Sequence, residues 1–497
     1  RYAPARTRLP RPPAKKGPPL HPHRFLKSIV LGWLGTKRVA IALLLVAVVL
    51  PFAPAGHASG SKPNVIFILT DDQRWDTLWA MPEVQSELVA KGMTFNDFFY
   101  TNPLCCPARA GILTGKSSRH TNCWWINNCF DNFKSQEAGD IAPFLQAHGY
   151  YTGLIGKYLN SYDSRNTTHV PPGWDRWVAE TSTDAYYNET FSVDGRPVRY
   201  GSQSQDYVTT VLTNYADDLI RHRAPANKPL FLYLAVNAPH EPAKPPPDHK
   251  TEFSGLAPYR PPNFNEQDVS DKPAWVRDQP TLTSSDVQSL DNFRINEYRT
   301  LLGVDDAVKA ILQDLAATGR TNNLIIFASD NGLAWGEHRM SEEKSNPYEE
   351  VIRGPLVARW DGVIPAGSID DHFVLNVDMA PTWAAAAGAG LSGVDGTSLL
   401  PLFTQTATTW RSDFYVEHAG GSGLPPAFCL VRNRSYKYVK YATGEEELYD
   451  LTADPFELTN QVRNSAYAAQ LDTLRQRYAE ICITPPSRGG KKKRLPL

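Results

Sequence analysis

Three short apolar runs, each followed within a few positions by polar residues, most constrain how this chain can fold. The runs are residues 65–69, 230–235 and 324–328, and each is entirely apolar. Continuous apolar runs of this length are typical of strands buried on both faces of a parallel sheet. Helical patterns lie between them, at 141–148 and 304–315. The sequence therefore predicts an α/β fold: a large domain with a mainly parallel mixed sheet flanked by helices.

The residues that follow the three runs are Asp71 and Asp72, His240, and Asp330 with Asn331. Because ligands of parallel α/β sheets bind beyond the carboxyl ends of the strands, we expect these side chains to lie close together. The four Asp and Asn side chains offer oxygen ligands, which suit calcium or magnesium better than zinc. Adjacent aspartates after a strand also serve as turn or helix caps, so the metal interpretation needs further support.

Residues 105–115 read Cys-Cys-Pro-Ala-Arg-Ala-Gly-Ile-Leu-Thr-Gly. Pro107 suits the first turn of a helix and Gly115 suits its end, so the pattern predicts a short helix that begins beside Cys105. The free N–H groups at a helix N-terminus favour an anion, and Arg109 adds a permanent cation one turn later. Cys105 and Cys106 fit either a structural pair or a reactive centre.

The spacing Cys-x-Pro-x-Arg, continued by Leu-Thr-Gly, resembles the signature of the type I sulfatases. In that family the first cysteine is oxidised to Cα-formylglycine, and the hydrated aldehyde attacks sulfur. The resemblance implies an alkaline-phosphatase-like fold and a formylglycine-generating enzyme as a partner that modifies Cys105. Two positions depart from the commoner pattern: Ala108 replaces serine, and Lys116 replaces arginine.

The resemblance extends to the other candidate residues. Lys157, in the Gly-Lys element, is expected to contact the sulfate, and His240 to face the leaving group. Lys344 lies between Gly-Glu-His and Tyr-Glu-Glu segments, and is expected to bridge the sulfate and the leaving oxygen. The resemblance thus implies catalytic residues Cys105, Arg109, Lys157, His240 and Lys344, and metal ligands Asp71, Asp72, Asp330, Asn331 and the modified Cys105.

Within the family, residues 156–160 and 301–306 look most like the N-acetylglucosamine-6-sulfatases and their endo-acting relatives. We therefore expect a sulfatase that acts on a sulfated sugar such as a glucosamine 6-sulfate unit, with Ca²⁺ as its ion and Mg²⁺ as the alternative ion. The alternatives are an arylsulfatase, a phosphonate or phosphodiester hydrolase of the same superfamily, and a catalytically silent carbohydrate-binding protein with unmodified Cys105. Four aromatic residues near the motifs could stack on sugar rings or simply pack in the core: Trp124, Trp125, Tyr158 and Tyr162.

Charge is unevenly distributed along the 497 residues. Ten of the 51 Lys and Arg residues lie in 1–38, which has no acidic residue, so the remainder carries 41 basic against 52 acidic residues, a net charge of −11. This acidic balance argues against a nucleic-acid partner. The basic stretch precedes an apolar run at 39–50 and small residues up to Ala58, which is typical of a secretory signal. A membrane anchor is less favoured, because a spanning helix needs about 20 residues.

We expect four parts in the chain. Residues 1–58 form the basic N-terminal region and signal peptide, 63–396 the catalytic domain, 397–487 a smaller α+β domain, and 488–497 a basic tail. Short strand patterns after about residue 397 predict an antiparallel sheet, followed by a helix. Among six cysteines, the pairs Cys123–Cys129 and Cys429–Cys482 are plausible disulfides of an exported protein, although spacing does not settle connectivity.

Overall fold

The computed structural model describes residues 62–127, 129–162, 168–182, 185–421, 425–483 and 485. The predicted signal region (1–58) and basic tail (488–497) lie outside the described residues. Across the described part of the chain, every helix is too short or too polar to span a membrane.

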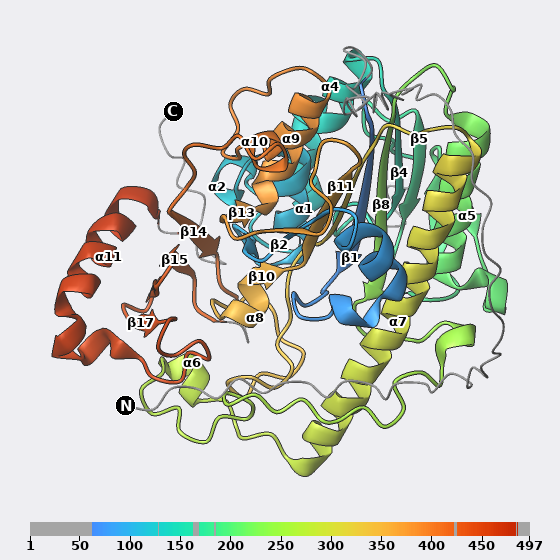
Figure 1. Cartoon of the computed structure of the whole chain (residues 1–497). Helices are drawn as coiled ribbons and strands as arrows, with labels where there is room; N and C mark the ends of the chain where they lie inside the picture. The colour runs from blue at the N-terminus through green and yellow to red at the C-terminus, as the bar shows by residue number, and fades with distance from the viewer. Residues whose placement is uncertain are drawn as a thin grey trace, which may run out of the picture. The chain divides into compact units, whose positions relative to one another are not determined.

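A ten-stranded mixed sheet forms the centre of the fold (Figure 1). Its five middle strands, β9, β1, β8, β4 and β5, are all parallel, and antiparallel pairs occur only toward the edges. This confirms the predicted mainly parallel mixed sheet. In sheet order the strands are β12 (Ser368–Asp370), β2 (Met93–Phe95), β11 (Leu356–Trp360), β9 (Asn323–Ser329), β1 (Asn64–Asp71), β8 (Leu230–Pro239), β4 (Tyr151–Gly156), β5 (Arg176–Glu180), β6 (Thr190–Val193) and β7 (Arg196–Arg199).

Helices cover both faces of this sheet (Figure 1). Successive residues of a strand point to opposite faces, so the apolar run of β1 contributes to two cores. Phe67 packs in the core that includes α1 (Cys105–Thr114), α4 (Ile141–Ala147) and α9 (Met379–Ala386). Ile66 and Ile68 pack in the core under α5 (Val208–Asp218) and α7 (Ser284–Ala317). The double burial explains why the run contains no polar residue.

Helix α7 is much longer than the predicted segment 304–315, because it begins at Ser284. Thr283 caps its N-terminus: the Thr283 hydroxyl accepts from the Asp286 N–H at 3.3 Å, and the Asp286 carboxylate accepts from the Thr283 N–H at 2.8 Å. Such a reciprocal capping box satisfies two N–H groups that a helix end would leave unpaired. The apolar stripe identified only part of the C-terminal half of the helix, although Leu290 in its first half is also buried.

The C-terminal part forms the predicted antiparallel sheet and helix. Strands β14 (Asp413–His418), β15 (Phe428–Asn433), β16 (Tyr436–Tyr441) and β17 (Glu446–Asp450) pair in sequence order. Leu471 and Leu474 of α11 (Ala468–Ile481) pack against this sheet. A disulfide joins Cys429 to Cys482, as expected.

Shorter elements complete the described structure. A small three-stranded sheet pairs β10 with β3 and β3 with β13. The remaining short elements are β3 (Phe98–Phe99), β10 (Arg353–Gly354), β13 (Val374–Leu375), α2 (Ser118–Thr121), α3 (Cys129–Phe133), α6 (Ala274–Arg277), α8 (Glu349–Ile352) and α10 (Leu400–Phe403).

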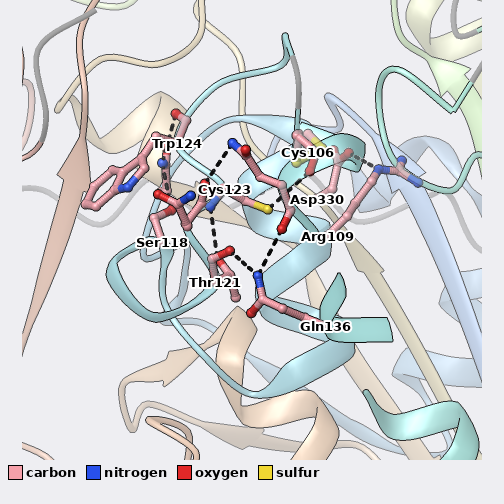
Figure 2. Close-up of a disulfide and its surroundings, with 12 residues drawn as sticks. Cys106, Arg109, Ser118, Thr121, Cys123, Trp124, Gln136 and Asp330 are labelled. Atoms are coloured by element: carbon pink, nitrogen blue, oxygen red, sulfur yellow. Dashed lines mark hydrogen bonds and ion pairs between the residues drawn. A yellow bond between two sulfur atoms is a disulfide. The ribbon is translucent and has the colours of Figure 1, made fainter. Parts of the chain in front are cut away.

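The expected pairing of Cys123 with Cys129 is wrong, because the disulfide joins Cys106 to Cys129 (Figure 2). Helix α1 packs on α3, and this contact brings Cys106 to the first residue of α3. Cys123 remains a free, buried thiol with its Sγ 3.6 Å from the backbone oxygen of Cys129. Burial raises the pKa of Cys123 to about 12, so the thiol stays protonated. Closeness in sequence suggested the local pair, and helix packing decided otherwise.

Candidate active site

The candidate residues predicted at strand ends meet at one edge of the sheet. Each lies at or just beyond the carboxyl end of one of four parallel strands that are adjacent in the sheet, β9, β1, β8 and β4. The residues and strands are Asp71 and Asp72 (β1), Lys157 (β4), His240 (β8), and Asp330 and Asn331 (β9).

Helix α1 brings Cys105 and Arg109 to the same edge. It begins at Cys105 and ends at Gly115, whose φ of 71° is the left-handed conformation that glycine adopts without strain. Every residue of α1 is buried, including Arg109. The Arg109 guanidinium donates from Nε to Asp330 Oδ2 at 2.7 Å, from Nη2 to Asp71 Oδ2 at 3.3 Å and from Nη1 to the Lys157 carbonyl at 2.8 Å. Arg109 thus connects α1 to three strand ends.

Lys157 reaches the site because of the glycine before it. A Cβ atom on Gly156, at φ 113°, would lie 1.8 Å from the Ala235 oxygen, so only glycine fits where β4 passes this close to β8. The Lys157 ammonium donates to Asp71 Oδ2. Although burial opposes its charge, the Asp71 carboxylate raises the pKa of Lys157, so the lysine remains a cation.

Lys344 comes from the long connection between β9 and α8. Its Nζ lies 2.8 Å from both carboxylate oxygens of Asp72 and 3.8 Å from Cys105 Sγ. His240 Nε2 lies 3.5 Å from Asp72 Oδ2, and its Nδ1 is 2.8 Å from the Glu241 carbonyl oxygen. That contact assigns the ring proton to Nδ1 in the neutral form, which leaves Nε2 facing the site.

Within the described residues, the acidic side chains make a possible metal site. One ligand atom each of Asp71, Cys105 and Asp330 lie within 4.8 Å of one another, and the same holds for Asp71, Asp72 and His240. Asp71 Oδ1 and Asn331 Oδ1 are buried without a hydrogen-bond partner. Because an unpaired buried oxygen is costly, these two atoms fit a bound cation well. The oxygen-rich donor set matches a hard divalent ion.

The pKa values of Cys105, Asp330 and Asp71 are shifted in different directions by burial and by neighbouring charges. Burial raises the pKa of Cys105, and the nearby lysines offset this only in part, so the unmodified thiol is protonated and a poor nucleophile. Burial and the charge of Asp71 together raise the pKa of Asp330 to about 6. Asp71 itself is held below its ordinary pKa: Lys157 and its other cationic neighbours outweigh its burial.

A cavity of about 230 Å³ opens above Cys105. Two of the residues that line it, Phe293 of α7 and Glu342, had no signal in the sequence. Glu241 follows His240 directly, so the argument from strand ends could have found it. The lining residues are Asp72, Cys105, Ile126, Asn160, His240, Glu241, Phe293, Leu333, Glu342 and Lys344.

The four aromatic residues near the motifs do not line this cavity. Tyr158 and Tyr162 are buried against Trp177, with ring centroids 5.0 and 5.6 Å away. Trp124 is also buried, and Trp125 donates its Nε1–H to the Gly420 carbonyl at 2.8 Å. Burial favours the packing alternative for Tyr158, Tyr162 and Trp124, whereas Trp125 is only half-buried.

Comparisons with known proteins agree with this site. Residues 63–389 match the family model described as sulfatase, and residues 336–483 match the model described as N-sulphoglucosamine sulphohydrolase, C-terminal. The chain is 34% identical over 456 residues to the N-acetylglucosamine-6-sulfatase of Homo sapiens, an alignment that covers 82% of each protein.

Two solved structures share the fold. One, solved in complex with its substrate D-glucosamine-2-N,6-O-disulfate, has a TM-score of 0.75 at 24% identity and covers 84% of this chain and 97% of its own. The other, the phosphonate monoester hydrolase of Agrobacterium radiobacter, has a TM-score of 0.66 at 22% identity, with coverages of 84% and 95%. The sulfatase model spans most of the chain, and a named sulfatase is similar over four fifths of it. The chain therefore belongs to the sulfatase family and is a sulfuric ester hydrolase.

Proposed function

We propose that this enzyme hydrolyses the 6-sulfate of a glucosamine unit, with a formylglycine made from Cys105 as nucleophile and Ca²⁺ as the bound ion. One observation carries the proposal: Cys105 lies at the N-terminus of α1, lines the cavity and has the Lys344 ammonium 3.8 Å from its sulfur. A nucleophile here would meet an anionic group already held by cations and by free N–H groups.

Modification of Cys105 fits its surroundings better than thiolate chemistry does. Burial favours the neutral thiol, which neither attacks sulfur nor binds a metal well. Formylglycine supplies a hydrated aldehyde, an oxygen nucleophile whose second hydroxyl allows sulfate to be released afterwards. A formylglycine-generating enzyme would be the partner that makes it.

Asp71, Asp72, Asp330 and Asn331 are the residues that would hold the ion. Ca²⁺ takes six to eight oxygen ligands at about 2.3–2.6 Å, and three carboxylates plus an amide oxygen supply most of such a shell. The unpaired Asp71 Oδ1 and Asn331 Oδ1 support this assignment. The bound ion would act as a Lewis acid on the sulfate oxygens.

Of the remaining candidate residues, three would bind the sulfate and one, His240, would protonate the leaving group. Arg109, Lys157 and Lys344 surround the sulfate position with positive charge, which is strongest as a catalytic effect in a buried site. Arg109 and Lys157 also hold the carboxylates in place through their ion pairs. His240 would act as the acid in its imidazolium form: Nδ1–H stays bonded to the Glu241 carbonyl, and the second proton, on Nε2, can pass to the departing oxygen.

The sugar substrate and the location of the enzyme rest on relatives. A relative of Homo sapiens is named N-acetylglucosamine-6-sulfatase, and a structural neighbour was solved with a sulfated glucosamine. Another relative, from Drosophila melanogaster, is named an extracellular sulfatase homolog. Together with the apolar run at 39–50, these names support an exported enzyme.

Two measurements test the proposal. The first is the intact mass of the peptide that contains residue 105, which distinguishes cysteine from formylglycine. The second is kcat/KM for release of sulfate from glucosamine 6-sulfate and from an aryl sulfate, beside hydrolysis of a phosphonate monoester. Formylglycine and a preference for the sugar sulfate are expected. An aryl or phosphonate preference would assign the enzyme to those classes, and an unmodified, inactive protein would favour a silent carbohydrate-binding role.

A further inference from the structure

We infer that Glu241, Glu342 and Asn160 select the leaving group, so that the enzyme prefers a glucosamine 6-sulfate with a free amino group and rejects one with an N-sulfate. The inference rests on the proposed function and makes it more specific. The observation behind it is that two kinds of polar side chain line the cavity above Cys105. One kind is cationic and attracts anions, and the other consists of hydrogen-bond acceptors, which attract donors and cations.

The first kind is cationic and suits the sulfate that reacts. Lys344 lines the cavity beside Cys105, with its Nζ 3.8 Å from Cys105 Sγ and 2.8 Å from both carboxylate oxygens of Asp72. Arg109 and Lys157 lie behind Cys105 and are fully buried. One sulfate group can use all of this positive charge, but only at the position next to residue 105.

The second kind consists of hydrogen-bond acceptors. Glu241, which is exposed, and Glu342, which is half-buried, both line the cavity. Within the described residues neither side chain forms a hydrogen bond or an ion pair. The two act on each other, since burial and the charge of Glu241 together raise the pKa of Glu342. Two carboxylates that act on each other in this way repel a further anion and attract a donor or a cation.

Asn160 gives an independent indication that this part of the cavity binds a polar molecule. It lines the same cavity, is only 6% exposed, and its Oδ1 is buried without a partner. A buried amide oxygen without a hydrogen bond is rare, and a hydroxyl or ammonium group of a bound sugar would satisfy it. Three acceptors therefore line the cavity in addition to Lys344, and we assign them to the leaving group.

The chemistry of the leaving group follows from this arrangement. The hydroxyls of a sugar donate to Glu241, Glu342 and Asn160, and a protonated 2-amino group adds an ion pair. An N-acetyl group keeps one donor and no charge. An N-sulfate places a second anion near two carboxylates, which is expected to cost on the order of tenfold or more in kcat/KM. An aryl sulfate offers no donor at all.

The test compares three sugars on the modified enzyme: glucosamine 6-sulfate, N-acetylglucosamine 6-sulfate and glucosamine 2-N,6-O-disulfate. The wild type should rank them in that order by kcat/KM for release of the 6-sulfate. The double variant Glu241→Gln/Glu342→Gln removes both charges and keeps the shape. It should reduce the ratio of free-amine to N-sulfated substrate by at least tenfold.

The matched control is Glu343→Gln, which removes a neighbouring charge that does not line the cavity. It should leave the ratio unchanged. Asn160→Ala should raise KM for the three sugars and leave KM for an aryl sulfate unchanged. A preference of the wild type for the N-sulfated sugar, an unchanged ratio in the double variant, or an equal change in Glu343→Gln would overturn the inference.

Binding provides a second measurement that does not depend on turnover. The Cys105→Ala protein can be titrated with the free-amine and N-sulfated sugars by calorimetry. The free-amine sugar should bind at least tenfold more tightly, and the Glu241→Gln/Glu342→Gln changes in this background should abolish the difference. Failure of turnover on all substrates would disprove the proposed function, whereas equal binding of the two sugars would disprove the selection of the leaving group.

Discussion

Two of the buried clusters of charged side chains in the described structure differ in whether a cavity lies beside their unpaired oxygens. In the first, around Asp71 and Cys105, two buried oxygens have no hydrogen-bond partner and a cavity opens beside them. In the second, which we call the C-terminal charge cluster, Glu447 accepts from three tyrosine hydroxyls at 2.6–3.0 Å and uses both carboxylate oxygens. The C-terminal charge cluster consists of Glu349, Arg432, Lys437, Glu447 and Glu457.

The difference shows that burial of charge does not by itself identify an active site. Lys437 is as buried as Lys157, and it donates to the Pro347 carbonyl at 2.7 Å and pairs with Glu457. The hydrogen bonds of Lys437 and Glu447 join β16, β17 and the segment before α8, which is a structural role. The Asp71 cluster instead keeps unsatisfied oxygens next to a cavity, and such atoms are available to a ligand.

The largest expected effect is a difference in kcat between substitutions of the two neighbouring cysteines of α1. Cys105→Ala should lower kcat by on the order of 10⁶-fold, as when the nucleophile of a covalent mechanism is removed. Cys106→Ala should leave kcat within a few-fold. It should lower the free energy of unfolding by about 3 kcal/mol, because it breaks the disulfide to Cys129. Sulfate release and urea unfolding measure both effects. Equal loss of kcat in two folded variants would contradict the assignment of the nucleophile.

The next effect compares one lysine from each cluster. Lys344→Met should reduce kcat/KM by about 10²- to 10³-fold, since it removes a cation next to residue 105. Lys437→Met should keep kcat and lower the free energy of unfolding by about 3–5 kcal/mol, because it leaves buried Glu457 without its partner. If folded Lys437→Met lost as much activity as Lys344→Met, the functional distinction between the clusters would fail.

A smaller effect concerns the metal. Ca²⁺ at 100 times its Kd should raise the free energy of unfolding by about 2.7 kcal/mol, and a chelator should reverse the gain together with activity. Asp330→Asn should weaken this response, whereas Glu447→Gln should not change it. Thermal unfolding at several calcium concentrations measures the response. A response that survives Asp330→Asn unchanged would place the ion elsewhere.

The last effect is a pH dependence of stability at Glu350, which lies next to Glu349 of the C-terminal charge cluster. Burial, with the charges of Glu337 and Glu457, raises the pKa of Glu350 to about 8 from an ordinary value of 4.5. Since the folded state holds this proton and the unfolded state does not, the contribution of Glu350 to stability is fully present below pH 4.5 and is lost as the pH rises to 8. The fall is at most about 1.4 kcal/mol per pH unit.

Glu350→Gln should flatten this part of the stability profile, and the amide can still accept from Asn263 Nδ2, which lies 2.8 Å from Glu350 Oε1. Glu480→Gln, an exposed charge change on α11, serves as the control and should leave the slope unchanged. Urea unfolding between pH 5 and 8.5 gives the slope. An identical slope in Glu350→Gln and the wild type would show that another group binds the proton.

Much of the fold could be predicted because its signals are local. Strands buried on both faces must be apolar throughout, so β1, β8 and β9 were recognisable from 65–69, 230–235 and 324–328. Parallel strands then require that Asp71, Asp72, His240, Asp330 and Asn331 gather at one edge, as the structure has them. Helix α1 was likewise recognisable from Pro107 and Gly115, which act within one turn of the chain.

The sequence by itself thus determined the class of fold, the edge of the sheet that carries the site, and the residues that meet there. Only the tertiary structure decided the disulfide of Cys106 with Cys129, the burial of Tyr158 and the acceptor side chains Glu241 and Glu342 in the cavity. The physical reason is the distance along the chain over which each signal acts. Periodicity and capping act between residues a few positions apart, whereas a cavity or a disulfide depends on how distant segments pack, and packing leaves no local pattern in either segment.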